Sequence, residues 1–438
     1  MTATTPAVPS GPASPADLDA STGARGARDQ LTRLLILLVG AVLILAIARV
    51  ITDTDELTRS GTFSAALRLA VPIGLIGLGA IYAERSGVVN IGLEGMMILG
   101  TWFGGWAGWQ FGPWWGVALG ILGGAIGGLV HAVATVTFGV DHIISGVAIN
   151  ILAGGVARYL SVITFDPTSG GGASQSPPIK GGIDEIDLPF LAGGNVFGWD
   201  TPDIFGWLER RRWFLLSDLG GLLRGITSEL SWLTLIAIAL VPLSYWFLWK
   251  TGTGLQLRSV GEHPAAAESL GVRVYRMKYL GVITSGAFAG LAGAFLVVEF
   301  AGIYREGQTG GRGFIGLATM IFGNWRPIGV AAGAGLFGFA DALQLRNDAT
   351  VHAMLLAVVL GMAVFAAISL RRGNRTQFVA AVVLGALFLV WYLASDTVPR
   401  QFVFFTPHLT TLLVLGLARR KSRMPAADGV VYRKGEAT

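Results

Sequence analysis

The sequence predicts an all-α protein, a polytopic transmembrane helical bundle of about ten to twelve spans. The first observation is composition: of 438 residues, 53% are hydrophobic and only 13% are charged, and the mean hydropathy is +0.61. A soluble chain of this size carries more charge, so these values place the chain in a lipid bilayer. The second is a succession of apolar runs long enough to cross the hydrocarbon core as helices. The third is the 63 glycines, because small residues let membrane helices pack closely.

Charge and motif content exclude several classes of function. The net charge is +5, but the Lys and Arg residues fall between apolar runs, where the positive-inside bias explains them, so we expect no nucleic-acid partner. The chain has no cysteine, which excludes disulfides, thiolate metal sites and cysteine nucleophiles. The five histidines are scattered, and we expect neither a metal site nor a cofactor. No Gly-Lys dipeptide occurs, so the phosphate-binding loop of ATPases is absent, and we expect no catalytic residues in this chain.

The first expected element is a tail. Residues 1–30 are rich in Ala, Pro, Ser and Thr and are predicted to be a disordered cytoplasmic tail, since they lack the apolar core of a signal peptide. The apolar run that begins at residue 31 follows several arginines, which predicts an uncleaved first helix with its N-terminus inside. The membrane domain is expected to cover residues 31–418, and the basic residues 419–438 are expected to form a second cytoplasmic tail.

Apolar runs define the spans inside this domain. They are expected near 33–51, 62–83, 88–110, 114–138, 143–165, 231–249, 279–300, 328–345, 350–370, 377–395 and 402–418. A shorter run at 313–323 is about half a bilayer deep by the helical rise, so we expect it to pair with 328–345 as a down-and-up unit. Alternation from a cytoplasmic N-terminus then places loop 250–278 inside and loop 166–230 outside.

Residues 91–102 and 315–325 share a pattern of glycine, apolar residues and a closing tryptophan. In the expected topology the two segments enter the membrane from opposite sides. The match is either an inverted repeat, which places a substrate path at the midplane beside interrupted helices, or a coincidence in glycine-rich apolar sequence.

Loop 250–278 contains a short predicted helix. Pro264 suits the first helical position because its φ is fixed and it has no amide hydrogen to lose, and Gly271 suits a left-handed C-terminal cap. Basic residues, Arg258 among them, favour the cytoplasmic side. A short helix of small residues at that surface predicts a contact for another protein.

Four stretches resemble a known family. LRSVGEHPAAAESLGV, at 257–272, resembles the cytoplasmic coupling loop of ABC-importer permeases of the branched-chain amino acid, simple-sugar and nucleoside group. Three further stretches resemble the nucleoside and simple-sugar branch of this group: ERSGVVNIGLEGMM at 84–97, SGAFAGLAGAFLVVE at 285–299 and GRGFIGLATMIFGNWRP at 311–327. The match runs in register from about residue 67 to 345, and the tail MPAADGVVYRKGE is also similar to that branch.

The resemblance implies that the short helix seats in a groove on a separate ATPase. The residues expected to carry this coupling are Arg258, Gly261, Glu262, Pro264, Ala265, Ala266 and Gly271. ATP-driven closure of the partner would then move the adjoining spans.

Polar residues inside apolar spans indicate the substrate path, because burying them is costly unless they are paired or hydrated. Asn90 and Glu94 are four residues apart, hence on one face of a continuous helix, and the resemblance places them in its signature segment. The residues expected to line the path are Asn90, Glu94, Trp102, Asn150, Phe314 and Trp325. For Glu94 a structural role is equally open, in which its carboxylate binds free amide hydrogens at a broken helix start.

The function implied by the resemblance is the permease subunit of an ATP-driven importer of nucleosides or related simple sugars, in a bacterial cell membrane. The expected partners are a second permease, identical or homologous, cytoplasmic ATP-binding subunits and an extracytoplasmic solute-binding protein. For that last partner, loop 166–230 is either a docking rim or a tolerated insertion. The alternative is an ion-coupled secondary transporter, which needs a titrating or sodium-binding carboxylate in the membrane, and Glu94 is the strongest candidate.

Overall fold

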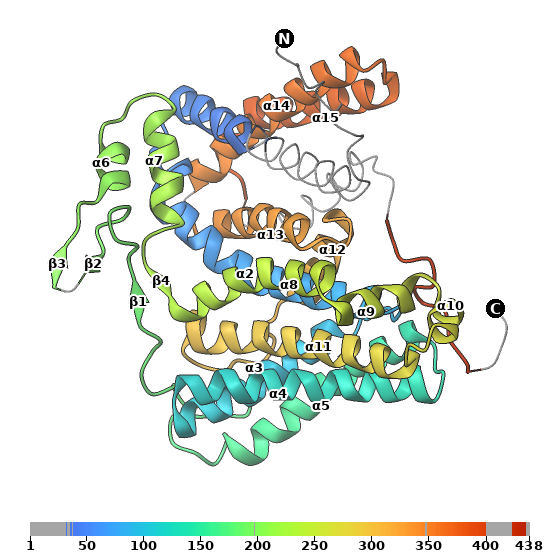
Figure 1. The fold of residues 1–438 in the computed structure, drawn as a ribbon. Helices are drawn as coiled ribbons and strands as arrows, with labels where there is room; N and C mark the ends of the chain where they lie inside the picture. Colours follow the sequence, from blue (N-terminus) through green and yellow to red (C-terminus); the bar gives the residue numbers. More distant parts are fainter. Residues whose placement is uncertain are drawn as a thin grey trace, which may run out of the picture.

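The computed structural model describes Thr32, Ile36 and residues 38–196, 198–346, 348–399 and 423–434. It is a helical bundle whose long helices run side by side (Figure 1). The long helices are α2 (Ser60–Arg85), α3 (Leu93–Phe111), α4 (Pro113–Ala132), α5 (His142–Thr164), α8 (Trp232–Lys250), α11 (Val274–Phe295), α14 (Asp348–Arg371) and α15 (Arg375–Ala394). The π-helical turns η2 (Val133–Thr137) and η3 (Leu296–Ala301) extend α4 and α11.

Among the described residues, seven helical segments are long and apolar enough to cross a membrane, so the chain is a multi-pass membrane protein. The segments are Asp55–Arg85, Pro113–Thr137, His142–Thr164, Trp232–Lys250, Val274–Ala301, Asp348–Arg371 and Arg375–Ala394. The expected total of ten to twelve membrane spans is not confirmed. The helix Leu38–Thr52, α12 (Arg312–Phe322) and α13 (Pro327–Ala342) are shorter apolar helices, and the expected span 402–418 and the N-terminal tail lie outside the described residues.

Helices α2 and α11 form the centre of the bundle. Both are mostly buried, and they pack on each other, while α13 covers α2 and α4 covers α11. Glycines permit the closest of these contacts: a Cβ on Gly124 of α4 would lie 2.3 Å from the carbonyl oxygen of Gly286, and one on Gly290 of α11 would lie 2.3 Å from that of Gly120. The two backbones therefore touch directly, which is the packing that the glycine content predicts.

Two boundaries differ from expectation. Helix α3 begins at Leu93 instead of 88, so residues 86–92 are not helical. Loop 250–278 contains α9 (Gly252–Glu262) as well as α10 (Pro264–Ser269), and α11 begins at Val274 instead of 279. The Thr251 hydroxyl accepts a hydrogen bond from the amide of Gly254 and so caps α9. Local capping thus overrides the glycines that suggested a loop.

Residues 166–230 are ordered by short elements. They contain α6 (Ile204–Arg210), α7 (Leu216–Gly225) and the strands β1 (Glu185–Ile186), β2 (Asn195–Val196), β3 (Trp199–Asp200) and β4 (Leu230–Ser231). The strands form two antiparallel pairs, β1 with β4 and β2 with β3. Helix α7 runs across the direction of the long helices, at the end of the bundle (Figure 1).

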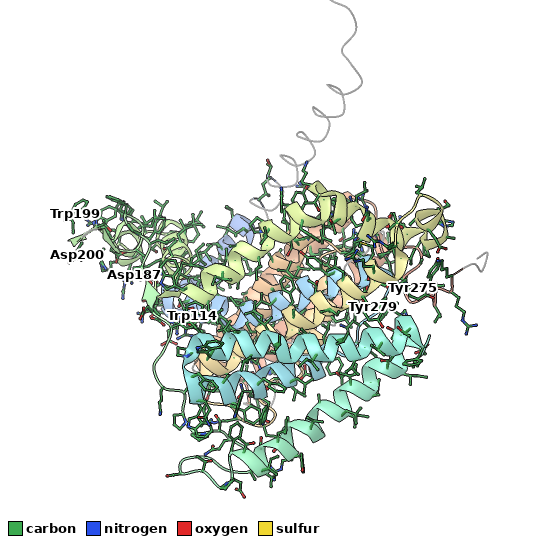
Figure 2. All side chains as sticks on the ribbon, turned by 60° about the horizontal axis from the view of Figure 1, so that its bottom comes forward. Trp114, Asp187, Trp199, Asp200, Tyr275 and Tyr279 are labelled. Carbon is green, nitrogen blue, oxygen red and sulfur yellow. The ribbon has the colours of Figure 1, made fainter. Side chains whose placement is uncertain are left out.

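The bundle therefore has two distinct ends. We call the end that carries α10, Arg85 and Trp325 the α10 end, and the end that carries α7 and the first residues of α2 the α7 end. In Figure 2, Tyr275 and Tyr279 lie toward the α10 end, whereas Asp187, Trp199 and Asp200 lie toward the α7 end. The 3-10 helix η1 (Asp55–Leu57) lies at the α7 end, where Thr350 at the start of α14 donates a hydrogen bond to Glu56 at 3.1 Å.

Candidate functional site

Helix α10 is built as the sequence predicts. It starts at Pro264, and His263 before it accepts a hydrogen bond through Nδ1 from the amide of Ala266 at 3.2 Å. Gly271 has φ +84°, a left-handed conformation that a residue with a side chain adopts only with strain. The predicted start and end of the short helix are therefore confirmed.

The predicted coupling residues divide between the surface and the interior. Ala266 and Gly271 are exposed, and the Glu262 side chain is 53% exposed. Pro264 is buried and Ala265 is half-buried. Gly261 packs so tightly that a Cβ there would lie 2.3 Å from the carbonyl oxygen of Arg85. Interior members of the set therefore hold α10 in place, and the outer members form its surface.

Sequence reasoning missed the largest apolar group on this surface. Leu270, directly after α10, is 85% exposed. It lies between the alanine-rich helix and the left-handed Gly271, so it adds an apolar group to the exposed surface that the resemblance assigns to the ATPase contact. Exposure depends on the fold, so the sequence alone contains only a weak signal for it.

Two residues anchor α9 and α10 to the bundle. The Nε of Arg258 donates to the carbonyl oxygen of Leu248 at 2.8 Å, and its guanidinium lies over the Trp249 ring. Arg85, at the end of α2, forms an ion pair with Glu262 at 3.5 Å. The α10 surface is thereby tied to the ends of α8 and α2.

Trp325 belongs to the same junction. Its indole N–H donates to Glu84 at 2.6 Å, and its carbonyl oxygen accepts from Arg85 at 3.2 Å. We expected this tryptophan among the path residues. The structure places it at the α10 end, where it joins α12 and α13 to α2.

The non-helical residues 86–92 lie beside polar side chains from other helices. Asn90 donates through Nδ2 to the Ser285 hydroxyl at 3.0 Å and accepts through Oδ1 from the amide of Gly92 at 3.1 Å. Asn150 donates to the carbonyl oxygen of Ile91 at 2.9 Å and accepts from the amide of Gly95 at 2.7 Å. These bonds satisfy backbone groups that an interrupted helix leaves free.

Histidines hold the first half of this segment. His131 of α4 lies 3.1 Å from the carbonyl oxygen of Val89, and His142 of α5 accepts from the Val89 amide at 3.3 Å. Ser285, the partner of Asn90, lies eleven residues into α11, or about 16 Å from its first residue by the helical rise. A bilayer core is about 30 Å thick, so the interruption reaches toward the middle of the bundle.

Glu94 joins two helix N-termini. It lies in the first turn of α3, and its two oxygens accept from the amides of Gly311 and Gly313 at the start of α12, at 3.0 and 2.6 Å. Both helix dipoles present their positive ends to this carboxylate. Helix α3 continues from here toward the α7 end and α12 toward the α10 end. This is the arrangement expected of interrupted helices in an inverted repeat.

The remaining aromatic candidates are apart from each other. Trp102 is 5% exposed and donates to the Ser161 hydroxyl at 3.1 Å, with its ring stacked on Trp106. Phe314 of α12 is 51% exposed. The structure therefore brings Asn90, Glu94 and Asn150 to one interruption, and it places Trp102, Phe314 and Trp325 in separate surroundings.

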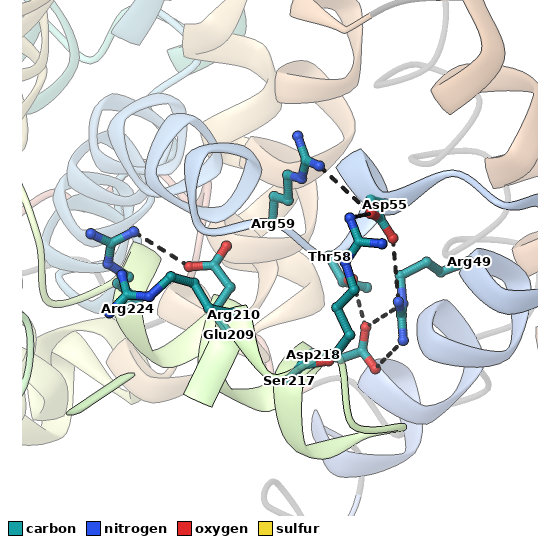
Figure 3. A pocket seen from close by; sticks show the side chains of 10 residues that line it. Arg49, Asp55, Thr58, Arg59, Glu209, Arg210, Ser217, Asp218 and Arg224 are labelled. Carbon is teal, nitrogen blue, oxygen red and sulfur yellow. Dashed lines mark hydrogen bonds and ion pairs between the residues drawn. The ribbon is translucent and has the colours of Figure 1, made fainter. Parts of the chain in front are cut away.

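A pocket of about 550 Å³ opens at the α7 end (Figure 3). Its lining includes five arginines and three carboxylates: Arg49, Arg59, Arg210, Arg212, Arg224, Asp55, Glu209 and Asp218. Arg49 forms an ion pair at 2.8 Å with the buried Asp218. The Arg59, Arg210 and Arg212 side chains are each more than half exposed, and each pairs with a carboxylate: Arg59 and Arg212 with Asp55, and Arg210 with Asp203.

Comparison with known proteins identifies the family. Residues 62–361 match the family described as branched-chain amino acid transport system / permease component. The guanosine ABC transporter permease protein NupQ of Bacillus subtilis is 32% identical over 85% of this chain and 96% of its own length. The nucleoside ABC transporter permease protein NupC of Lactococcus lactis is 29% identical over 84% of this chain and 95% of its own.

A third relative is named for another solute. The putative glucose ABC transporter permease protein TsgC13 of Haloferax volcanii is 32% identical over 66% of this chain and 78% of its own length. No solved structure matches the chain. The match to the family model and the long alignments to permeases agree with the geometry of the bundle, and the chain belongs to the family of branched-chain amino acid transport system permease components.

Proposed function

We propose that this permease imports nucleosides or related simple sugars, driven by ATP hydrolysed on separate subunits that dock at α10. The observation that carries the proposal is the α10 surface, where Ala266, Leu270 and Gly271 are exposed on a helix that is anchored from behind. The names of NupQ, NupC and TsgC13 support this solute class. In this account the α10 end and both termini face the cytoplasm of a bacterial cell.

The proposed complex contains a second permease. Bacillus subtilis has a second permease named for guanosine, the guanosine ABC transporter permease protein NupP. It is 24% identical to this chain over 309 residues, and NupQ of the same organism is 32% identical. Lactococcus lactis likewise has NupB beside NupC. Two permeases named for one solute in one organism support pairing with a homologous or identical subunit.

The proposed external partner is a solute-binding protein at the α7 end. The pocket at this end is lined by five arginines and three carboxylates, and complementary charge favours the encounter of two proteins. The ordered elements of residues 166–230 support a docking rim. The solute path then runs through the interruption at Asn90 and Glu94, where backbone and amide groups offer hydrogen bonds to a neutral polar solute.

Ion-coupled transport remains the alternative, and the surroundings of Glu94 disfavour it. Both carboxylate oxygens already accept hydrogen bonds from backbone amides. The residue is also 8% exposed, so the cap already occupies part of the acceptor capacity of a buried carboxylate.

Uptake in proteoliposomes tests the proposal. Permease, its partner permease and ATPase are reconstituted, with ATP inside and solute-loaded binding protein outside. We expect uptake of a labelled nucleoside or simple sugar that stops with an ATPase defective in hydrolysis and persists with a protonophore and a sodium ionophore. Uptake that is independent of ATP and is lost when the ion gradient is removed would contradict the proposal.

A further inference from the structure

The C-terminal segment of residues 423–434 contacts the backbone of α9. The amide of Ala427 donates to the carbonyl oxygen of Gly261 at 2.9 Å, and the amide of Ala426 donates to Glu262 at 3.2 Å. Figure 1 shows this red segment beside α9 and α10. The contact joins the end of α9 to a part of the chain more than 150 residues away.

Tyr432 fastens the segment to α10. Its side chain is 6% exposed and packs in an apolar cluster with Val260, Ala267, Val274 and Met277. Its hydroxyl donates a hydrogen bond to Glu268 of α10. A buried aromatic ring with a paired hydroxyl stabilises such a contact both by apolar burial and by the hydrogen bond.

The opposite side of the segment packs on residues 86–92. A Cβ on Gly87 would lie 3.1 Å from the carbonyl oxygen of Ala427, and one on Gly429 would lie 3.4 Å from the Val89 side chain. Lys278 of α11 donates to the carbonyl oxygen of Gly87 at 3.1 Å. Ala427 therefore contacts both α9 and the start of the interrupted segment, with Ala426 beside it on the α9 side and Gly429 on the side of residues 86–92.

Asp428 sits between these two contacts. Its carboxyl group is largely buried and interacts with the carboxyl group of Glu84, as well as with Lys278 and Arg85. Burial raises the pKa of Asp428 to about 6, and the positive charges of Lys278 and Arg85 oppose that rise. The segment therefore places a carboxyl group among Glu84, Lys278 and Arg85, which ties it to the ends of α2 and α11.

We propose that residues 423–434 form a strap that transmits displacement of α10 to residues 86–92, and through them to the interruption at Asn90. The strap binds α10 through Tyr432, α9 through Ala427 and the interrupted segment through Gly87 and Val89. Val89 is next to Asn90, whose side chain bonds Ser285 in the middle of the bundle. The inference rests on the proposed function of α10 as the ATPase contact, and it adds a route from that contact to the solute path.

Deletion of residues 423–438 tests the strap in the reconstituted complex. The number of ATP molecules hydrolysed per solute imported is expected to rise about tenfold, the usual size of a coupling between sites, while ATPase affinity stays within about twofold. Tyr432→Ala is expected to act in the same direction and Tyr432→Phe more weakly, because only a hydroxyl is lost. Met424→Ala, at a 55% exposed position of the segment, serves as the matched control.

The outcomes separate the strap from the proposed function. An unchanged ATP-to-solute ratio in the deletion and in Tyr432→Ala would overturn the strap. Loss of ATPase binding together with transport would also overturn it, since the segment would then be part of the docking surface. Failure of the wild-type permease to bind an ATPase would instead overturn the proposed function. Tyr432→Phe keeps the ring, so its result stands if the larger changes impair folding.

A cross-link gives an independent measurement. Because the chain has no cysteine, Tyr432→Cys with Glu268→Cys can be joined by a short bismaleimide without background. Tyr432→Cys removes the ring that fastens the strap, so the unlinked variant is expected to import less solute per ATP, and linking is expected to restore that ratio if the strap moves as one body with α10. A further loss of import after linking would mean that the segment must detach and would overturn the proposal.

Discussion

Glu94→Ala is expected to abolish uptake and to lower the stability of the permease. The substitution leaves the amides of Gly311 and Gly313 without acceptors at a buried helix start. Each orphaned buried donor costs about 1–3 kcal/mol, so the total is about 2–6 kcal/mol. Glu94→Gln keeps one acceptor but turns an amide donor toward the other N–H, and its cost should be about half. Thermal unfolding in detergent and uptake in proteoliposomes measure the two effects.

Glu306→Gln provides the matched control. Glu306 is 45% exposed and pairs with Arg158 at the surface, where an ion pair contributes about 0–1 kcal/mol. If Glu94→Ala unfolded at the wild-type temperature and only weakened solute affinity, the carboxylate would be a ligand for the solute and the capping role would be wrong.

Leu270→Asp is expected to weaken ATPase binding about thirtyfold, because loss of a central apolar contact at an interface costs about 2 kcal/mol or more. The permease itself should fold normally, since Leu270 is 85% exposed and packs on little of its own chain. Titration of detergent-solubilised permease with labelled ATPase measures the affinity.

The same change at the other end of the bundle controls for surface charge. Leu216→Asp alters a leucine that is 49% exposed in α7 and is expected to leave ATPase affinity unchanged. If both variants lost ATPase affinity equally, the cause would be general destabilisation of the permease, and a docking role for α10 would be contradicted.

Much of the bundle was predictable because its signals are local. Apolar runs of bilayer length mark α2, α4, α5 and α11, and Pro264 and Gly271 mark α10. The glycines predicted that helices would pack closely, but not that α4 and α11 would be the pair in closest contact. These features depend on residues that are neighbours in sequence.

The features that were missed depend on distant residues. The start of α3 moved from 88 to 93 because His131, His142 and Asn150 satisfy the backbone of the preceding segment, and no local pattern marks such partners. Asn90 and Glu94 were selected because they are unusual polar groups in apolar sequence. Their bonds to Ser285 and to the start of α12 required the fold, and their role as path residues stays a prediction.

The aromatic candidates show the same limit. Trp325 was chosen because tryptophan stacks on rings, yet its indole N–H binds Glu84 at the α10 end. Leu270 was overlooked because sequence does not reveal which apolar residue remains uncovered. The strap combines both difficulties, since Tyr432 and α10 are separated by more than 150 residues.

A photo-activated cross-linker placed at residue 270 tests most directly whether α10 is the contact for an ATPase. In membranes that contain the complete transporter, our account predicts a cross-linked product of permease and ATPase from position 270, and none from the same probe at position 216. A product with the ATPase from position 216, or the absence of any from position 270 in a complex that hydrolyses ATP and imports solute, would contradict it.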